Sequence, residues 1–164
     1  MALKHQQIID ELVLRFNRIT VANGFYLDLA TYDDLQHPQG LQTASDWRAS
    51  IYDHDEETVN EATAPDVTGN REYHQLSIDV ELQKQQINTS AVDTDIRKAI
   101  ADVRKGLSQS RTTPFPLDRT LNGLAINLLP LGFTIPKSEL GEYVVGQAII
   151  KFRIDYRTTI FLES

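Results

Sequence analysis

Three charged residues near the middle of the chain, Asp79, Glu81 and Lys84, are of types that metal-dependent chemistry uses. Side chains two residues apart on a β-strand project from the same face, so the carboxylates of Asp79 and Glu81 could share one divalent cation. Together with a nearby lysine, such a pair could serve metal-dependent cleavage of DNA. The competing interpretation is a strand whose solvent-exposed face carries ordinary charges.

The position of the lysine decides between these interpretations. Lys84 has the opposite parity to Asp79 and Glu81 and lies three residues after the glutamate. Restriction-type nucleases place the corresponding lysine two residues after the glutamate. We therefore favour a solvated strand face, and keep a metal-dependent nuclease using Asp79 and Glu81 as the less favoured alternative.

A second group of potential ligands is the acidic run that begins at Asp53 and contains His54, Asp55, Glu56 and Glu57. Its oxygen and imidazole groups could bind a metal, but it lacks the glycine and the ligand spacing of a calcium loop. A flexible acidic turn is the favoured interpretation.

The remaining candidate is His74, which has the parity of the apolar residues Leu76 and Ile78, so we expect a structural histidine at the edge of the core. No serine lies in a nucleophile elbow, and the glycines form no phosphate-binding loop. The sequence thus predicts no catalytic residue, metal ligand or cofactor, and the protein is not expected to be an enzyme.

Composition limits the class of protein. The chain has 164 residues, 41% of them hydrophobic, and no cysteine, which suits one domain over residues 1–164 and excludes disulfides and thiolate zinc sites. It has neither a signal-peptide pattern at its start nor an apolar run of about 18 residues, so we expect a protein that does not span a membrane. A net charge of −7 argues against a broad basic surface for nucleic acid.

Charge is divided unevenly along the chain. From Asp28 to Gln83 there are 13 acidic residues and two basic ones, Arg48 and Arg71. From Lys84 to Ser164 there are 11 basic residues and 8 acidic ones. If folding places the two halves on different flanks, copies of the chain can attract one another head to tail.

The elements that position these residues can be read from hydrophobic periodicity. Apolar residues at helical spacing predict a first helix from Ile8 to Ile19 that ends at Asn23 and Gly24, with its polar residues, including Glu11, Arg15 and Arg18, on other faces. A second apolar stripe predicts a helix from Val92 to Leu107.

Alternation predicts five strands, and the connections between them are polar. The strands are expected at residues 25–31, 47–52, 75–82, 124–128 and 148–157, and the long connections at residues 33–46, 53–69 and 108–123. The predicted fold is therefore an α+β single domain, with a mainly antiparallel sheet of about five strands and both helices on one face.

Two of the connections hold the residues that we expect at an interface with a partner. They are Asp55, Glu56 and Glu57 in one connection and Arg111, Phe115 and Arg119 in the other. Phe115 stands between two prolines, and aromatic residues are enriched at the centres of interfaces. Trp47 is the other candidate anchor, but it leads an apolar strand face and is expected in the core.

The order of these elements resembles that of the tail-terminator, or tail-completion, proteins of long-tailed bacteriophages. The resemblance covers residues 1–157. It lies in the amphipathic first helix running into Asn23-Gly24-Phe25-Tyr26, the variable acidic loop, the Leu76–Leu82 strand, the Asp95–Ile100 helix segment and the closing strand that ends Ile154-Asp155-Tyr156.

The resemblance implies a structural protein of the virion tail or neck, assembled in the cytoplasm of the host bacterium. Such a protein forms a ring, commonly a hexamer, on the end of the tail tube, stops growth of the tube and presents a surface to the head-tail connector. Its partners would be its own copies, the tail tube protein and the connector or neck protein, while DNA passes through the lumen. Another neck or baseplate component is the alternative.

Overall fold

The structure is a computed structural model, which describes residues 3–29, 47–59, 71–86, 89–136, 138–140 and 143–159. Two α-helices, α1 (Lys4–Phe16) and α2 (Thr89–Leu107), accompany a short 3₁₀ helix, η1 (Val21–Asn23). The strands are β1 (Arg48–Val59), β2 (Arg71–Gln86), β3 (Asn127–Thr134), β4 (Ser138–Leu140) and β5 (Tyr143–Thr159). This is an α+β single domain, as predicted.

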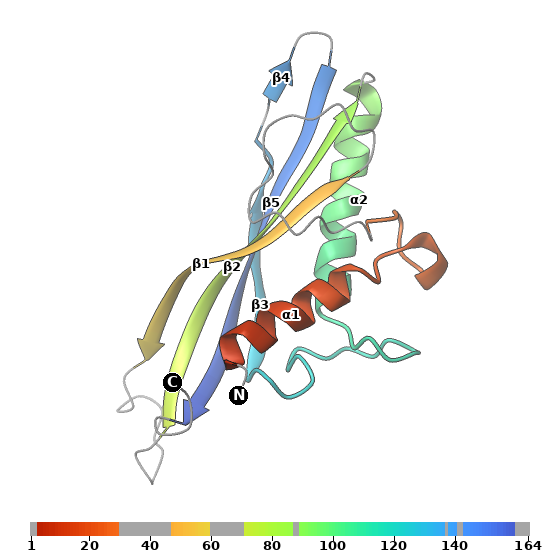
Figure 1. The fold of residues 1–164 in the computed structure, drawn as a ribbon. Coiled ribbons are helices and arrows are strands. Elements are labelled where there is room, and N and C mark those ends of the chain that lie inside the picture. The colour runs from red at the N-terminus through yellow and green to blue at the C-terminus, as the bar shows by residue number, and fades with distance from the viewer. Residues whose placement is uncertain are drawn as a thin grey trace.

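Four long strands form the main sheet in the order β1–β2–β5–β3, and every neighbouring pair is antiparallel (Figure 1). The three-residue strand β4 pairs with the beginning of β5, on the side of β5 where β3 lies further along. β1 and β3 are therefore the two outer strands of the main sheet. The five predicted strands are not matched one for one, because the one predicted at residues 25–31 is not formed over its described part and β4 was not predicted.

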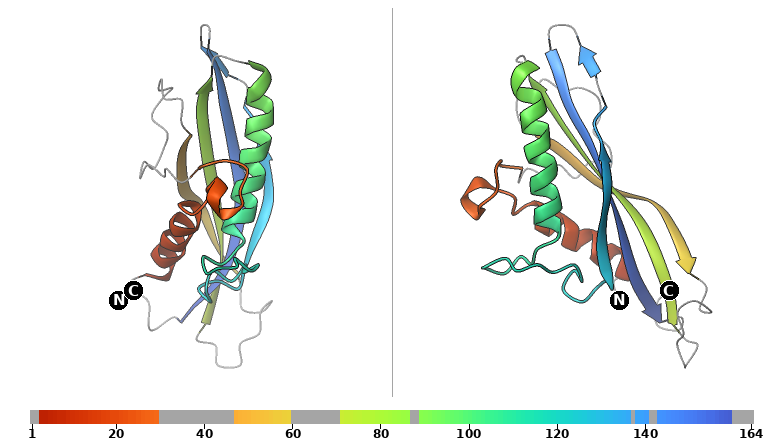
Figure 2. Two further views of the ribbon diagram at one scale, coloured as in Figure 1. Left: turned by 90° about the vertical axis from the view of Figure 1, so that its right-hand side faces the viewer. Right: turned by 180° about the vertical axis from the view of Figure 1, so that it is seen from behind.

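One face of the sheet carries the core. Alternate residues of the central strands, among them Ile78 and Val80 on β2 and Ile150 and Phe152 on β5, are fully buried or nearly so, as the alternation predicts. Ile8, Leu12 and Phe16 of α1 and Ile96, Ile100 and Val103 of α2 belong to the same apolar cluster, which places both helices against that face. The two helices cross at a steep angle over long, twisted strands (Figure 2).

The predicted strand at residues 25–31 is wrong over the described part, Phe25 to Leu29. Phe25 and Leu29 are buried, but the amides of Tyr26 and Leu27 donate to the Asp102 carboxylate of α2, at 3.1 and 2.9 Å, and not to a neighbouring strand. The Asp102 carboxylate thus accepts the backbone hydrogen bonds that a neighbouring strand would accept. Burial raises the pKa of Asp102, against the opposing effect of these two amides.

The predicted flexible turn at residues 53–69 is wrong where the structure describes it, because β1 continues to Val59. Its backbone pairs with β2 over the whole length, with one irregularity between Asp53 and Asp55. The side chains of residues 53–58 are exposed, so the segment lacks the apolar alternation that signals a strand. Residues 60–69, and the predicted loop at residues 33–46, lie outside the described residues.

β3 begins later and ends later than predicted. It starts at Asn127 and runs through Pro130 to Thr134, with an irregularity between Pro130 and Gly132. Proline lacks the amide hydrogen that a central strand must donate, but an outer strand tolerates it, especially beside a bulge. Proline therefore did not end this strand.

Candidate assembly surfaces

The connection between α2 and β3, residues 108–126, is held against α1 by the side chain of Arg15. Arg15 is completely buried, and each nitrogen of its guanidinium donates at least one hydrogen bond. Nε donates to Glu11 at 2.9 Å, Nη1 donates to the carbonyls of Leu107 and Asp118 at 2.9 and 2.7 Å, and Nη2 donates to the Asp118 carboxylate at 2.7 Å. One side chain thus joins α1, the end of α2 and the connection.

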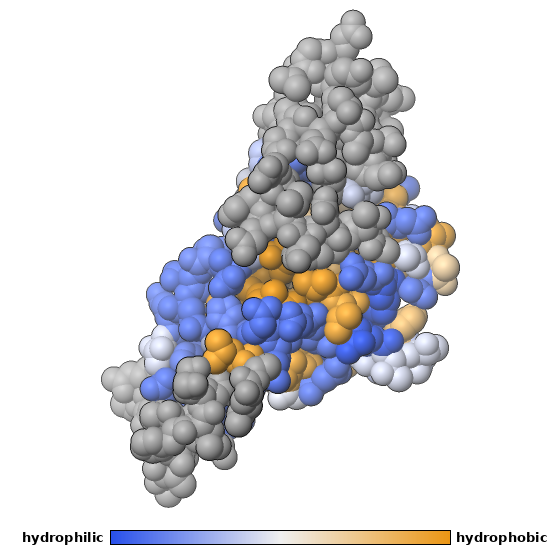
Figure 3. Space-filling view, viewed as in Figure 1, coloured by the Kyte–Doolittle hydropathy of each residue, from blue (hydrophilic) through white to orange (hydrophobic). Residues whose placement is uncertain are grey.

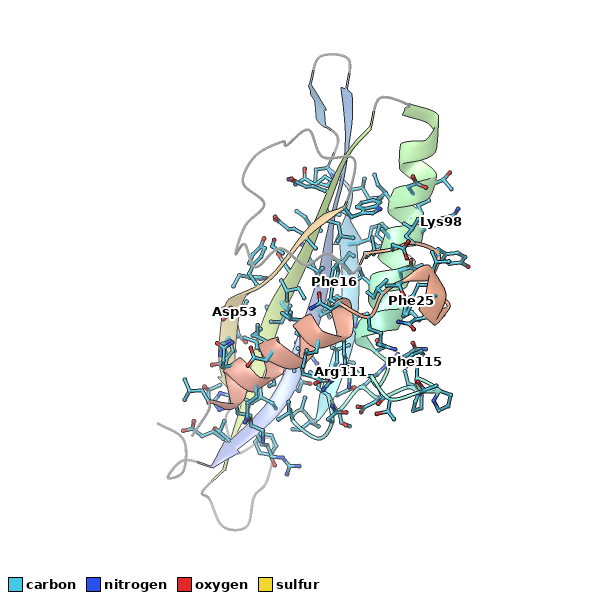
Figure 4. All side chains as sticks on the ribbon, turned by 45° about the vertical axis from the view of Figure 1, so that its right-hand side comes forward. Phe16, Phe25, Asp53, Lys98, Arg111 and Phe115 are labelled. Atoms are coloured by element: carbon cyan, nitrogen blue, oxygen red, sulfur yellow. The ribbon has the colours of Figure 1, made fainter. Side chains whose placement is uncertain are left out.

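Glu11 extends this network to Arg111, one of the residues that were expected to contact a partner. Arg111 Nη2 donates to Glu11 Oε2 at 3.0 Å, and the side-chain amide of Asn122 donates to Glu11 Oε1 at 3.1 Å. Arg111 is still partly exposed, but its guanidinium is paired within the subunit. In Figure 4 its label lies beneath α1, beside the connection.

Phe115 also has a partner within its own subunit. The guanidinium of Arg18 lies over the Phe115 ring, 4.6 Å from its centroid, and also 5.6 Å from the Phe25 centroid. Arg18 in turn donates to the carbonyl of Gly106 at 2.7 Å. Burial lowers the pKa of Arg18, and the nearby charges of Arg15 and Arg111 act in the same direction.

Asp118 supplies the negative charge that faces Arg15. Burial acts to raise its pKa, but hydrogen bonds from Thr120, the Asn122 amide and Arg15 outweigh that effect and lower the pKa to about 2. Asp118 is therefore ionised throughout the neutral range, and it shapes the turn that leads to β3 as well as holding Arg15.

This network was missed in the sequence. Glu11, Arg15 and Arg18 were expected to face away from the core, yet all three are buried. Glu11 and Arg15 lie on the side of α1 that the 108–126 connection covers, and Arg18 follows the helix and contacts the same connection. Glu11 and Arg15 are four residues apart, a spacing that suits an ion pair on a helix. This spacing was the sequence feature from which the network could have been inferred.

Beside this connection lies an open groove of about 580 Å³. It is lined by the end of α2, the connection and β3, and it contains three cationic side chains and three apolar residues: Arg104, Lys105, Arg119, Leu117, Leu129 and Pro130. Lys105 donates to the carbonyl of Gly24 at 3.1 Å. Arg104 and Arg119 form no salt bridge with any residue that the structure describes.

The same edge of the sheet exposes large apolar side chains. Leu117 in the groove is 70% exposed, and Leu131 and Phe133 on β3 are 56% and 44% exposed. Arg104 lies over the Phe133 ring, 5.8 Å from its centroid. A basic groove bordered by exposed apolar residues is an arrangement that favours contact with another molecule.

The opposite edge of the sheet, β1, is acidic. Asp53, Asp55, Glu56 and Glu57 follow one another with only His54 between them, and all are exposed. In Figure 3 the left of the described surface, where β1 lies, is hydrophilic. The predicted interface residues Asp55, Glu56 and Glu57 therefore lie on a strand and not in a loop.

The bulge in β1 divides these carboxylates between the two faces of the sheet. Asp53 and Glu56 pair with Ile78 and Leu76 and so lie on the helix-covered face, where His5 of α1 is 2.9 Å from Asp53 and 3.9 Å from Glu56. Tyr156 also donates to Glu56. Asp55 and Glu57 lie on the other face, and neither forms an ion pair within the described part of the chain.

That second face holds the carboxylates considered for metal chemistry, and each has a protein partner. Tyr52 donates to Glu81 at 2.8 Å, and His54 lies 3.1 Å from Asp79. Burial, together with the bond to Glu81, raises the pKa of Tyr52. Among the described residues there is no group of three or more histidine, aspartate or glutamate side chains that could hold a metal ion. The side chain of Lys84 lies outside the described part of the structure.

The remaining candidates are core residues, as predicted. His74 is buried at the edge of the core, stacks on Tyr156 with ring centroids 4.8 Å apart, and lies 2.8 Å from the Thr158 hydroxyl. Trp47 is also buried, so it belongs to the core of the subunit.

Of the six residues predicted at interfaces, Asp55, Glu56, Glu57 and Arg119 are exposed at two different edges of the sheet. Arg111, Phe115 and Glu56 have partners within the subunit. Figure 4 shows Asp53 near one end of α1 and Phe115 near the other.

No protein-family model and no curated protein matches this chain. None of the helices in the described ranges is long and apolar enough to cross a membrane.

Proposed function

We propose that this protein is a structural subunit of a phage or phage-like virion that assembles head to tail into a closed ring, in the manner of a tail terminator. The observation that carries the proposal is the chemical difference between the two outer edges of the sheet. β1 presents carboxylates, whereas β3 and the end of α2 present arginines beside exposed apolar residues.

Two unlike edges on one subunit favour a particular kind of assembly. A two-fold dimer joins identical patches, and here like charges would meet. A contact between the β1 edge of one copy and the β3 edge of the next joins opposite charges, leaves both free edges available for further copies, and closes into a ring if the rotation permits. Complementary charges also fix the direction in which subunits are added.

The tail-terminator role gives this ring a place in the particle. A ring, commonly of six subunits, would bind the end of the tail tube, stop its polymerisation and present its other side to the head-tail connector. DNA would pass through its lumen without sequence-specific binding, and assembly would take place in the cytoplasm of the host bacterium. The same contact would also suit another neck or baseplate component, which differs only in its position in the particle.

The mass of the purified protein in solution tests the proposal. Native mass spectrometry and negative-stain microscopy should show a closed ring, either free or formed on isolated tail tubes, and tubes incubated with the protein should stop elongating. A protein that is monomeric at every concentration up to about 100 µM, and that does not bind tube ends, would contradict it. Addition of serum albumin controls for non-specific effects on the tubes.

A further inference from the structure

We infer that the groove between the end of α2 and β3 binds the carboxylates of Asp55 and Glu57 from a second copy of this chain. The inference rests on the proposed ring and specifies the contact that builds it. It follows from three observations: carboxylates on one edge and guanidinium groups on the other that form no ion pair with a described residue, and exposed apolar side chains that border the groove.

Asp55 and Glu57 are the β1 carboxylates for which the described part of the subunit provides no ion-pair partner. Asp53 and Glu56 face α1, where His5 and Tyr156 contact them. Asp55 and Glu57 project from the opposite face, two residues apart, so their side chains leave the strand about 7 Å from each other. They are exposed and form no ion pair with a described residue.

The groove offers a matching number of guanidinium groups. Arg104 and Arg119 line it and have no carboxylate partner among the described residues, and Nε of Arg104 is buried without a hydrogen-bond acceptor. A guanidinium binds a carboxylate through two parallel hydrogen bonds, so two arginines can receive two carboxylates with defined geometry. Lys105 adds positive charge at the rim but is already bonded to Gly24.

The apolar border gives the contact the remainder of its surface. Leu117 projects into solvent beside the two arginines, and Phe133 lies against Arg104. A strand lying along the groove would cover both side chains and exclude water from the ion pairs, which strengthens them. One subunit cannot make this contact with itself, because the groove and β1 lie at opposite edges of its sheet.

Charge reversal tests the contact. The first variant, Arg104→Glu with Arg119→Glu, has a negative groove and a negative edge. The second variant, Asp55→Lys with Glu57→Lys, has a positive edge and a positive groove. Each variant alone should repel its own copies, and we expect association at least roughly 100-fold weaker than that of the unchanged protein. Circular dichroism and thermal unfolding establish that both variants are folded.

Mixing the two variants gives the decisive measurement. In an equimolar mixture, each groove meets an edge of opposite charge, so rings in which the two variants alternate should form again. A protein carrying all four substitutions should form rings by itself. Arg97→Glu with Lys98→Glu, which changes the same charge on the exposed face of α2, is the matched control and should assemble normally.

The outcomes separate this contact from the ring itself. If the unchanged protein forms rings and the reversed variants do so equally well, the contact is wrong and the proposed function stands. The same conclusion follows if the variants lose assembly but the mixture does not regain it. If the unchanged protein forms no ring in solution or on tubes, both the contact and the proposed function fail.

Discussion

At the scale of single residues, the guanidinium of Arg15 holds together segments that are about 90 to 100 residues apart in sequence. A buried charge of this kind is tolerated because Glu11 and Asp118 neutralise it and the carbonyl groups of Leu107 and Asp118 accept two further N–H groups. The desolvation of the three charges is costly, so the network adds geometric definition to the 108–126 connection more than net stability.

We expect Arg15→Met to lower the free energy of unfolding by about 3–5 kcal/mol, because it leaves Glu11 and Asp118 with less compensated negative charge. Arg15→Lys should also be destabilising, since an ammonium cannot reproduce the planar set of donors. Urea unfolding measures both. Arg97→Met, at an exposed position of α2, is the control; an equal effect there would contradict a special role for Arg15.

The lowered pKa of Asp118 makes part of the stability dependent on pH. Its pKa of about 2 in the folded protein lies below the unfolded value of about 3.9, so its contribution is present above pH 4 and is lost as the pH falls toward 2. Asp118→Asn should lower the unfolding free energy by about 2 kcal/mol at pH 6, and the difference should shrink at pH 3. Asp10→Asn, on the exposed side of α1, provides the comparison, and a pH-independent difference for Asp118→Asn would refute the account.

At the scale of elements, the close approach of α2 to the segment after α1 depends on Gly106. A Cβ atom at this position would lie 2.7 Å from Cγ1 and 2.8 Å from Cδ1 of Ile19, which is fully buried. The helical conformation itself does not require glycine here. Glycine is therefore required at position 106 because there is no space for a side chain, and not because of its backbone conformation.

We expect Gly106→Ala to destabilise the protein by about 1–3 kcal/mol, although alanine gains up to about 1 kcal/mol in helix propensity. In an Ile19→Ala background, which makes room for the new methyl group, the same change should be neutral or stabilising. A double-mutant cycle from denaturant unfolding measures the coupling. Additive effects would show that Ile19 is not the obstacle.

The elements that were predicted correctly are those in which the pattern of apolar and polar side chains follows the pattern of burial. Both helices, β2 and β5 have regular apolar periodicity, because each buries one side against the common core. The outer half of β1 was missed since it buries neither face fully, and the segment after Gly24 was mistaken for a strand since its apolar residues alternate while its amides bind Asp102.

The candidate interface was predicted less completely, for a related reason. The exposed acidic residues of β1 and Arg119 could be chosen from charge alone. In the sequence, Arg111 and Phe115 also look like exposed loop residues. Their partners within the subunit, Glu11 and Arg18, are about 100 residues away and could not be identified from the sequence. Arg104 was not predicted at an interface, because its place in a groove depends on β3, which is distant in sequence.

At the scale of the whole molecule, the uneven charge along the chain becomes an uneven charge across the sheet. If opposite edges meet between copies, association should weaken as salt screens the ion pairs. We expect the concentration for half-maximal assembly to rise at least roughly tenfold between 0.05 and 0.5 M NaCl. Sedimentation velocity measures it, and the control is the unfolding free energy over the same salt range. Stronger assembly in salt would indicate an apolar contact instead.

Both outer strands contain an irregularity, between Asp53 and Asp55 in β1 and between Pro130 and Gly132 in β3. An unbroken strand edge is a template on which further strands can pair without limit, as in fibrils. The two irregularities interrupt the outer edges and so disfavour strand pairing between copies of the protein. In the proposed ring, contacts between copies would then depend on side chains and not on strand pairing. A ring held by such side-chain contacts would be reversible until its last contact closes, so that misplaced subunits would leave and be replaced.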